Sequence, residues 1–134
     1  MNVTVVGLGR VGLPTACYFA RVGHNVMGCD TDTVLVGKLR DGTNPMPWEP
    51  GVDSSLLTAT DSLDEALVGS DLVYIIVPTP SVQSRMDSSH VERVLGELSS
   101  FSGLIVVGST LDPQEARRLC GGDRTVYNPP LIRL

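Results

Sequence analysis

Three glycines near the start of the chain have the spacing of a phosphate-binding turn. Gly7, Gly9 and Gly12 form the pattern G-x-G-x-x-G directly after a short β-branched run. The first glycine permits a tight turn out of a strand, the second lets a pyrophosphate approach the backbone, and the third lets the next helix pack closely on the sheet. The N-terminus of that helix offers N–H groups and a partial positive charge to phosphates. The pattern therefore predicts a dinucleotide-binding βαβ unit.

An acidic residue, Asp30, follows the second β-like run at the offset expected of a carboxylate that binds a ribose diol. Taken alone, the glycines are compatible with a structural turn, and Asp30 with a solvated acid at a strand end. The order strand, turn, helix, strand, acid favours the cofactor site. Asp32 follows, and no Lys or Arg intervenes before Lys38, so an adenosine 2′-phosphate would meet two carboxylates and no cation. We therefore predict NAD, not NADP, as the cofactor.

The composition is that of one globular domain. The chain has 134 residues, of which 42% are hydrophobic, and this is enough to bury a sizeable core. A net charge of −5 and the lack of a basic cluster beyond Arg117 and Arg118 argue against a nucleic-acid partner. The longest apolar run, residues 72–77, is too short to cross a bilayer, and we expect no membrane association and no targeting segment.

The three cysteines, Cys17, Cys29 and Cys120, have no metal-like spacing. An odd, scattered set indicates reduced thiols in a cytoplasmic protein, and we predict no metal site. None of them has a legible activating environment, so each is interpreted as a structural thiol and not as a nucleophile. His24 and His90 form no recognisable pair with an acid, and we expect a turn residue and a helix-surface residue.

Strand and helix signals alternate along the chain, which predicts an α/β fold. Six strands complete a doubly wound parallel sheet of the Rossmann type, with order 3-2-1-4-5-6 and the ligand at the carboxyl ends of the strands. The predicted strands are residues 3–6, 25–29, 57–60, 72–77, 104–107 and 125–127, and the predicted helices are residues 11–22, 33–40, 62–68, 89–99 and 113–120.

Capping residues mark three of the predicted helix starts. We expect Asp61 to cap the third helix, Ser89 and Glu92 to form a capping box in the fourth, and Asp112 to precede Pro113 at the start of the fifth. The proline-containing stretch 43–51 breaks the rhythm of strand and helix, and residues 78–88 are predicted to form a polar loop.

Four strings occur in one order along the chain: VVGLGRVGLPT at 5–15, WEPG at 48–51, VPTPS at 77–81 and YNP at 127–129. In this combination the chain resembles the N-terminal domain of the UDP-glucose/GDP-mannose dehydrogenase family, over essentially its whole length. Enzymes of that family oxidise the 6-hydroxyl of a nucleotide sugar to a carboxylate with two molecules of NAD. The resemblance therefore implies an NAD-binding Rossmann domain that accepts hydride from the sugar.

The resemblance also implies roles for individual residues. Thr110 matches a threonine at the catalytic centre that helps to hold a water molecule. The segment 49–51 matches a loop near the cofactor and the sugar, and Trp48 beside it either packs over the sugar site or covers an edge of the core. The residues expected to contact NAD are Gly7, Gly9, Arg10, Val11, Gly12, Asp30, Thr31, Pro78, Thr79, Pro80, Ser109 and Thr110.

The chain departs from the family pattern at three positions. Pro130 stands where the family usually has a glutamate that takes part in the chemistry, Gly108 where it often has a glutamate, and Leu35 where it often has a lysine. The sequence given ends at Leu134, before the family's central helix and sugar-nucleotide domain, which carry the catalytic cysteine and lysine. We expect residues 1–134 to be a single NAD-binding domain without that catalytic half.

Three functional hypotheses remain open at this point. The first is the cofactor half of a nucleotide-sugar dehydrogenase, as an isolated domain, a truncated piece or one half of a split enzyme, with a nucleotide sugar or a separate catalytic-domain chain as its partner. The second is a non-catalytic NAD-binding or regulatory module, which Pro130 and Gly108 favour. The third is a remnant that no longer binds nucleotide, against which the intact glycines and Asp30 argue. Apolar surfaces normally covered in the family favour self-association, so a homodimer is a further expectation.

Overall fold

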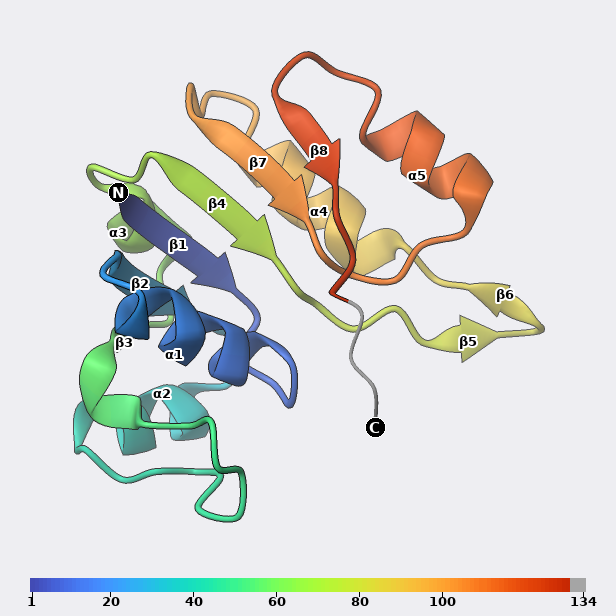
Figure 1. Cartoon of the computed structure of the whole chain (residues 1–134). Helices are drawn as coiled ribbons and strands as arrows, with labels where there is room; N and C mark the ends of the chain where they lie inside the picture. The colour runs from blue at the N-terminus through green and yellow to red at the C-terminus, as the bar shows by residue number, and fades with distance from the viewer. Residues whose placement is uncertain (131–134) are drawn as a thin grey trace.

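Six parallel strands form one sheet in the computed structural model, which describes residues 1–130 (Figure 1). The order is β3-β2-β1-β4-β7-β8. Because β5 and β6 pair only with each other, this is the predicted order 3-2-1-4-5-6 when the strands of the main sheet alone are counted. The doubly wound fold is therefore confirmed. The strands are β1 (Asn2–Val6), β2 (Asn25–Cys29), β3 (Thr58–Thr60), β4 (Leu72–Ile75), β7 (Leu104–Val107) and β8 (Thr125–Tyr127).

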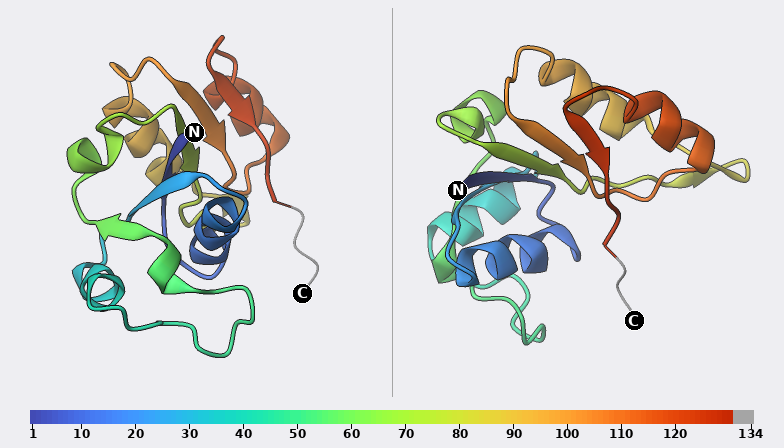
Figure 2. Two further views of the ribbon diagram at one scale, coloured as in Figure 1. Left: turned by 60° about the vertical axis from the view of Figure 1, so that its left-hand side comes forward. Right: turned by 45° about the horizontal axis from the view of Figure 1, so that its top comes forward.

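Helices cover both faces of this sheet, as right-handed crossovers require (Figure 2). On one face lie α1 (Gly12–Arg21) and α2 (Thr33–Arg40); on the other lie α3 (Leu63–Leu67), α4 (Ser89–Glu97) and α5 (Pro113–Leu119). Side chains that alternate along each strand pack into two cores, one on each face of the sheet. Val5 packs in the core beneath α1 and α2, and its neighbour Val6 packs in the core beneath α3, α4 and α5.

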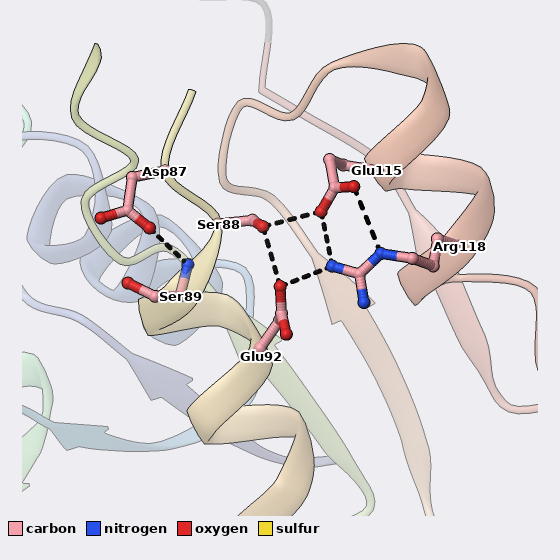
Figure 3. A network of polar contacts seen from close by, with 6 residues as sticks. All are labelled: Asp87, Ser88, Ser89, Glu92, Glu115 and Arg118. Atoms are coloured by element: carbon pink, nitrogen blue, oxygen red, sulfur yellow. Dashed lines mark hydrogen bonds and ion pairs between the residues drawn. The ribbon is translucent and has the colours of Figure 1, made fainter. Parts of the chain in front are cut away.

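The start of α4 is built differently from the prediction (Figure 3). The expected capping box between Ser89 and Glu92 is wrong, because the carboxylate of Asp87 accepts the Ser89 N–H at 2.9 Å. Glu92 turns instead toward Ser88, whose hydroxyl oxygen lies 3.0 Å from one Glu92 oxygen and 2.8 Å from one of Glu115. Arg118 on α5 donates to both glutamates, so this network ties α4 to α5.

The N-cap of α3 differs from the prediction, and that of α5 agrees with it only in part. Ser62, and not Asp61, caps α3, since its hydroxyl accepts the N–H of Glu65 at 3.3 Å. Asp112 holds the N-cap position of α5 as predicted, but its side chain makes no capping hydrogen bond. Ser62 can cap α3 because an N-cap side chain accepts the N–H of the residue three positions further on, and for Ser62 that residue is Glu65.

The polar loop after β4 contains a hairpin that the sequence did not predict. It consists of β5 (Ser81–Val82) and β6 (Arg85–Met86) and projects away from the main sheet (Figure 1). Its turn residues, Gln83 and Ser84, have φ values of 49° and 64°. Such turns are normally marked by Gly or Asn, and neither residue is present here. A short helix, η1 (Ser54–Leu56), was also missed, whereas residues 43–51 are irregular as predicted.

Candidate functional site

A pocket of about 860 Å³ lies at the carboxyl ends of the strands, where the sheet order reverses between β1 and β4. This is the position at which open α/β sheets bind their ligands, and its volume suits a cofactor-sized molecule. The residues predicted to contact the cofactor that line it are Gly7, Gly9, Arg10, Val11, Gly12, Asp30, Thr31, Pro78, Thr79, Ser109 and Thr110. Pro80 is not among the lining residues; its carbonyl accepts the Asp87 N–H at 2.8 Å at the base of the hairpin.

The three glycines of the turn have different structural roles. Gly7 has φ +94°, and a Cβ atom there would lie 2.0 Å from the carbonyl oxygen of Ile76. At Gly12 a Cβ atom would lie 1.7 Å from the carbonyl oxygen of Gly7. The fold itself therefore requires both. At Gly9 a Cβ atom would meet nothing within 4 Å, so the bare backbone of Gly9 borders open space in the pocket.

The backbone beyond Gly9 is arranged to bind an anion. The first helical hydrogen bond of α1 runs from the Leu13 N–H to the Gly9 carbonyl at 3.1 Å. The N–H groups of residues 10–12 precede that bond and have no partner in the helix. Together with the helix dipole they suit a pyrophosphate, which is the fit that a dinucleotide demands.

Asp30 connects the end of β2 to this glycine turn. One oxygen of its carboxylate accepts the Leu8 N–H at 2.6 Å, and the other accepts the Asp32 N–H at 2.9 Å. Leu8 is itself fully buried in the core, so the turn is fixed from both sides. Each carboxylate oxygen keeps a further lone pair, and the half-buried Asp30 lines the pocket, so it can still accept hydrogen bonds from a ribose diol.

The predicted charge environment of Asp30 needs correction. Asp32 is not a lining residue, because its carboxylate caps α2 by accepting the N–H groups of Val34 and Leu35, each at 3.0 Å. The further acids that line the pocket, Asp61 and Glu97, come from other parts of the chain, and so does a cation, Arg93.

Ser109 holds the loop that follows β4. Its hydroxyl accepts the Val77 N–H at 2.8 Å and donates to the Val77 carbonyl at 2.9 Å. Ser109 is only 3% exposed. Both hydrogen-bonding groups of Val77 are thereby paired although the regular strand has ended at Ile75, and this fixes the path of the chain into Pro78 and Thr79.

The other end of the pocket carries Thr110 and Pro130. Thr110 is exposed and lies directly after Ser109 at the end of β7. Pro130 lines the same pocket and offers no carboxylate. Gly108 is buried, and a Cβ atom there would lie 2.4 Å from a ring carbon of Tyr74, whose hydroxyl donates to the Asn128 carbonyl at 2.8 Å. The tyrosine ring thus occupies the space that a glutamate at position 108 would need.

The three cysteines lie in different surroundings. Cys29 lines the pocket, where burial, followed by the charge of Asp30, raises the pKa of its thiol to about 11. Burial also raises the pKa values of Cys17 and Cys120. Cys17 contacts the Asp53 carbonyl at 3.4 Å, and neither Cys17 nor Cys120 lines the pocket. All three are therefore protonated at neutral pH and suited to structure, not to nucleophilic attack.

One face of α4 forms a wall of the pocket that sequence reasoning missed. His90, Arg93, Val94 and Glu97 line the pocket and recur at i, i+3, i+4 and i+7. That spacing could have predicted a shared helix face, but a face with mostly polar residues is also typical of a helix surface exposed to solvent. By contrast, residues 49–51 do not line the pocket, and Trp48 is 75% exposed, which rules out its interpretation as a cover for the core.

The parallel sheet, its topological switch point and the glycine turn together define a dinucleotide-binding Rossmann domain. A profile of the NAD-binding domain of the UDP-glucose/GDP-mannose dehydrogenase family matches residues 1–121. The chain belongs to this family and is its NAD-binding domain, and its cofactor is NAD.

Individual relatives agree with this assignment. A UDP-N-acetyl-D-mannosamine dehydrogenase of Pyrococcus horikoshii is 32% identical over 130 residues, which cover 89% of this chain and 31% of the relative. A UDP-glucose 6-dehydrogenase of Pseudomonas aeruginosa is 38% identical over 109 residues, which cover 75% and 24%. The solved ternary complex of GDP-mannose dehydrogenase from P. aeruginosa superposes with a TM-score of 0.82 at 26% identity, covering 99% of this chain and 37% of that one. The chain thus spans between 24% and 37% of the length of these relatives. Within residues 1–130 no helix has the length and apolar character needed to traverse a bilayer.

Proposed function

We propose that the domain holds NAD with its adenosine ribose at Asp30 and its nicotinamide beside Thr110, as the hydride-accepting half of a nucleotide-sugar 6-dehydrogenase. The observation that carries this proposal is the continuity of one pocket from Asp30 at the end of β2, across the glycine turn, to Thr110 after β7. Bound NAD supplies a hydride acceptor at carbon 4 of the nicotinamide, and the domain sets its position relative to the sugar carbon.

Each part of the chain has its own task in this arrangement. Asp30 accepts hydrogen bonds from the ribose, and the backbone beyond Gly9 binds the pyrophosphate. Ser109 acts as a positioning residue, because both of its hydrogen bonds are spent on Val77. Thr110, whose side chain is exposed in the pocket, holds a water molecule near the nicotinamide end.

The orientation of NAD in the pocket can be tested by calorimetric titration with NAD and with ADP-ribose, which lacks the nicotinamide. We expect Asp30→Ala to weaken both ligands by similar factors. Thr110→Val should weaken NAD and leave ADP-ribose unchanged, because only NAD reaches Thr110. If Thr110→Val weakened both ligands equally, or Asp30→Ala neither, the proposed orientation would be wrong.

The sugar oxidation itself is proposed to need a further part that carries the catalytic cysteine and lysine, in the same polypeptide or as a separate chain. The neighbouring coding sequence would support this if it held a block similar to Gly-Gly-x-Cys-x-Pro-Lys-Asp. With that part present, UDP-glucose, UDP-N-acetylmannosamine or GDP-mannose should drive formation of NADH, measured by its absorbance. The domain alone should give none.

A second candidate function is a non-catalytic NAD-binding module. It is favoured by Pro130 at the nicotinamide end and by the Tyr74 ring against Gly108, which together remove both acids expected there. It predicts NAD binding with no turnover when the catalytic part is supplied.

We further propose a cytoplasmic location and a homodimer that covers exposed apolar side chains such as Tyr18 and Val22, which are 60% and 52% exposed. A sedimentation run that shows only monomer would exclude the dimer.

A further inference from the structure

A cation on α4, Arg93, lines the same pocket as Cys29 and Asp30, the residues at the end of β2 where the proposed function places adenosine. Among the described lining residues the arginines are Arg10, in the glycine turn, and Arg93, on α4. Leu35, where relatives of the family often carry a lysine, is packed against the core beneath α1 and α2 and does not line the pocket. A second cation therefore reaches the pocket from α4, on the face of the sheet opposite α2 (Figure 2).

The residues that line the pocket together with Arg93 have the polarity of a base-binding site. Val6, Cys29, Leu63 and Val94 line the pocket and also belong to, or pack against, the core beneath α3, α4 and α5. They give the pocket an apolar floor. The rim carries carboxylates from Asp30, Asp61 and Glu97, which can accept hydrogen bonds from ribose hydroxyls or from an exocyclic amino group.

The guanidinium of Arg93 is held by its own helix. Its Nη2 lies 2.9 Å from Nδ1 of His90, one turn earlier on the same face. A hydrogen bond of this kind lies in the plane of the guanidinium, so it fixes the plane and leaves its two faces free. A planar, weakly hydrated cation with a free face stacks well on an aromatic base.

We propose that Arg93, oriented by His90, is a specificity-determining residue that stacks on the adenine ring of the dinucleotide. The inference rests on the proposed function, since it requires adenosine at the Asp30 end. It assigns to α4 a contact that neither the glycine pattern nor Asp30 provides, because those groups recognise only the phosphates and the ribose.

The test compares Arg93→Met, Arg93→Lys and the matched control Arg117→Met, which removes a cation from the exposed surface of α5. Affinities for NAD, ADP-ribose and NADP are measured by calorimetry at low and high salt. Arg93→Met should weaken NAD and ADP-ribose by the same factor, about tenfold. Arg93→Lys should give nearly the same loss, because lysine lacks the planar face. Arg117→Met should change nothing.

Other outcomes overturn the proposal in distinguishable ways. Full rescue by Arg93→Lys, with a loss that disappears at high salt, would mean that Arg93 acts only as a charge. A loss confined to NADP would mean that it contacts a 2′-phosphate. Unchanged binding of NAD in Arg93→Met, with a wild-type protein that binds NAD, would refute the role of Arg93 alone. Failure of the wild-type protein to bind ADP-ribose would refute the proposed orientation and this inference together. His90→Leu provides a second test. It should weaken NAD binding less than Arg93→Met does, since it removes the restraint on the guanidinium and keeps the stacking group.

Discussion

The carboxylate of Asp30 accepts the N–H of Leu8 at 2.6 Å, across 22 positions of sequence. The proposed ribose ligand therefore also fixes the glycine turn that would hold the pyrophosphate. Its second oxygen accepts the Asp32 N–H, so one side chain joins the ends of β1 and β2 to the start of α2. The proposed binding of ribose and of phosphate would therefore be coupled, because the same carboxylate contacts both sites.

This coupling predicts the effect of Asp30→Asn. The amide retains the size of the side chain but can accept only one of the two backbone N–H groups, and it presents donors to the other. We expect the Kd for NAD to rise at least tenfold, and the preference for NAD over NADP to narrow because a negative charge is lost. The matched control is Asp32→Asn, which leaves a good cap on α2 and lies outside the pocket lining. Equal losses in the two variants would contradict the argument.

Gly9→Ala separates binding from folding. A methyl group at this position meets no atom within 4 Å, so the melting temperature should stay close to that of the wild-type protein. The same methyl group stands where a pyrophosphate must approach the backbone, so affinity for NAD should fall at least tenfold. Gly96→Ala on α4 is the control, since its Cβ atom also meets nothing and Gly96 does not line the pocket. It should preserve affinity and raise helix stability by up to about 1 kcal/mol.

Ser109→Ala should destabilise the fold as well as the site. It leaves the N–H and the carbonyl of Val77 without their partner in a half-buried position. The expected loss is about 1–3 kcal/mol in the free energy of unfolding, measured by denaturant titration. NAD should also bind more weakly, because Pro78 and Thr79 lose their fixed path. Thr110→Val, one residue further and exposed, should leave the unfolding free energy unchanged. A Ser109→Ala variant as stable as wild type would show that Val77 finds other partners.

The network between α4 and α5 predicts a loss of stability in acid. Hydrogen bonds from Arg118 and Ser88 lower the pKa of Glu115 below its ordinary value of 4.5. A carboxyl whose pKa is lowered in the folded state stabilises the fold above its unfolded pKa, and this contribution disappears as the pH falls through the folded value. The melting temperature, measured from about pH 6 down to about pH 3, should therefore depend less on pH in Arg118→Met than in the wild-type protein. Identical profiles would mean that the ion pair contributes nothing in solution.

The thiol of Cys29 predicts a loss of stability at alkaline pH. Its pKa is raised from 9.0 to about 11, mainly by burial. An acid whose pKa is higher in the folded state stays neutral there while the unfolded chain ionises, so stability falls as the pH rises from 9 toward 11. Cys29→Ala should reduce this slope in melting curves that follow pH. Rapid modification of Cys29 by a thiol reagent at pH 7 in the folded protein would contradict the protonated, buried state.

The sequence alone determined the order of strands, the glycine turn and the acid at the end of β2. Local chemistry decides these features: β-branched runs form the strands, glycines permit the close approaches at positions 7 and 12, and right-handed crossovers leave one arrangement of the sheet. The caps of α3 and α4 and the hairpin at Gln83 and Ser84 escaped prediction, because neighbouring polar groups compete for the same N–H groups and the turn lacks its usual glycine.

Only the tertiary structure decided which residues share the pocket. His90, Arg93 and Glu97 are distant in sequence from the glycine turn, and they reach the pocket because α4 packs on the sheet beside the switch point. Packing between elements also sets the Tyr74 ring against Gly108, whereas the cap that Asp32 forms on α2 is a local contact within three residues. Sequence spacing specifies contacts within one helix, strand or turn, whereas contacts between elements depend on how their apolar faces pack.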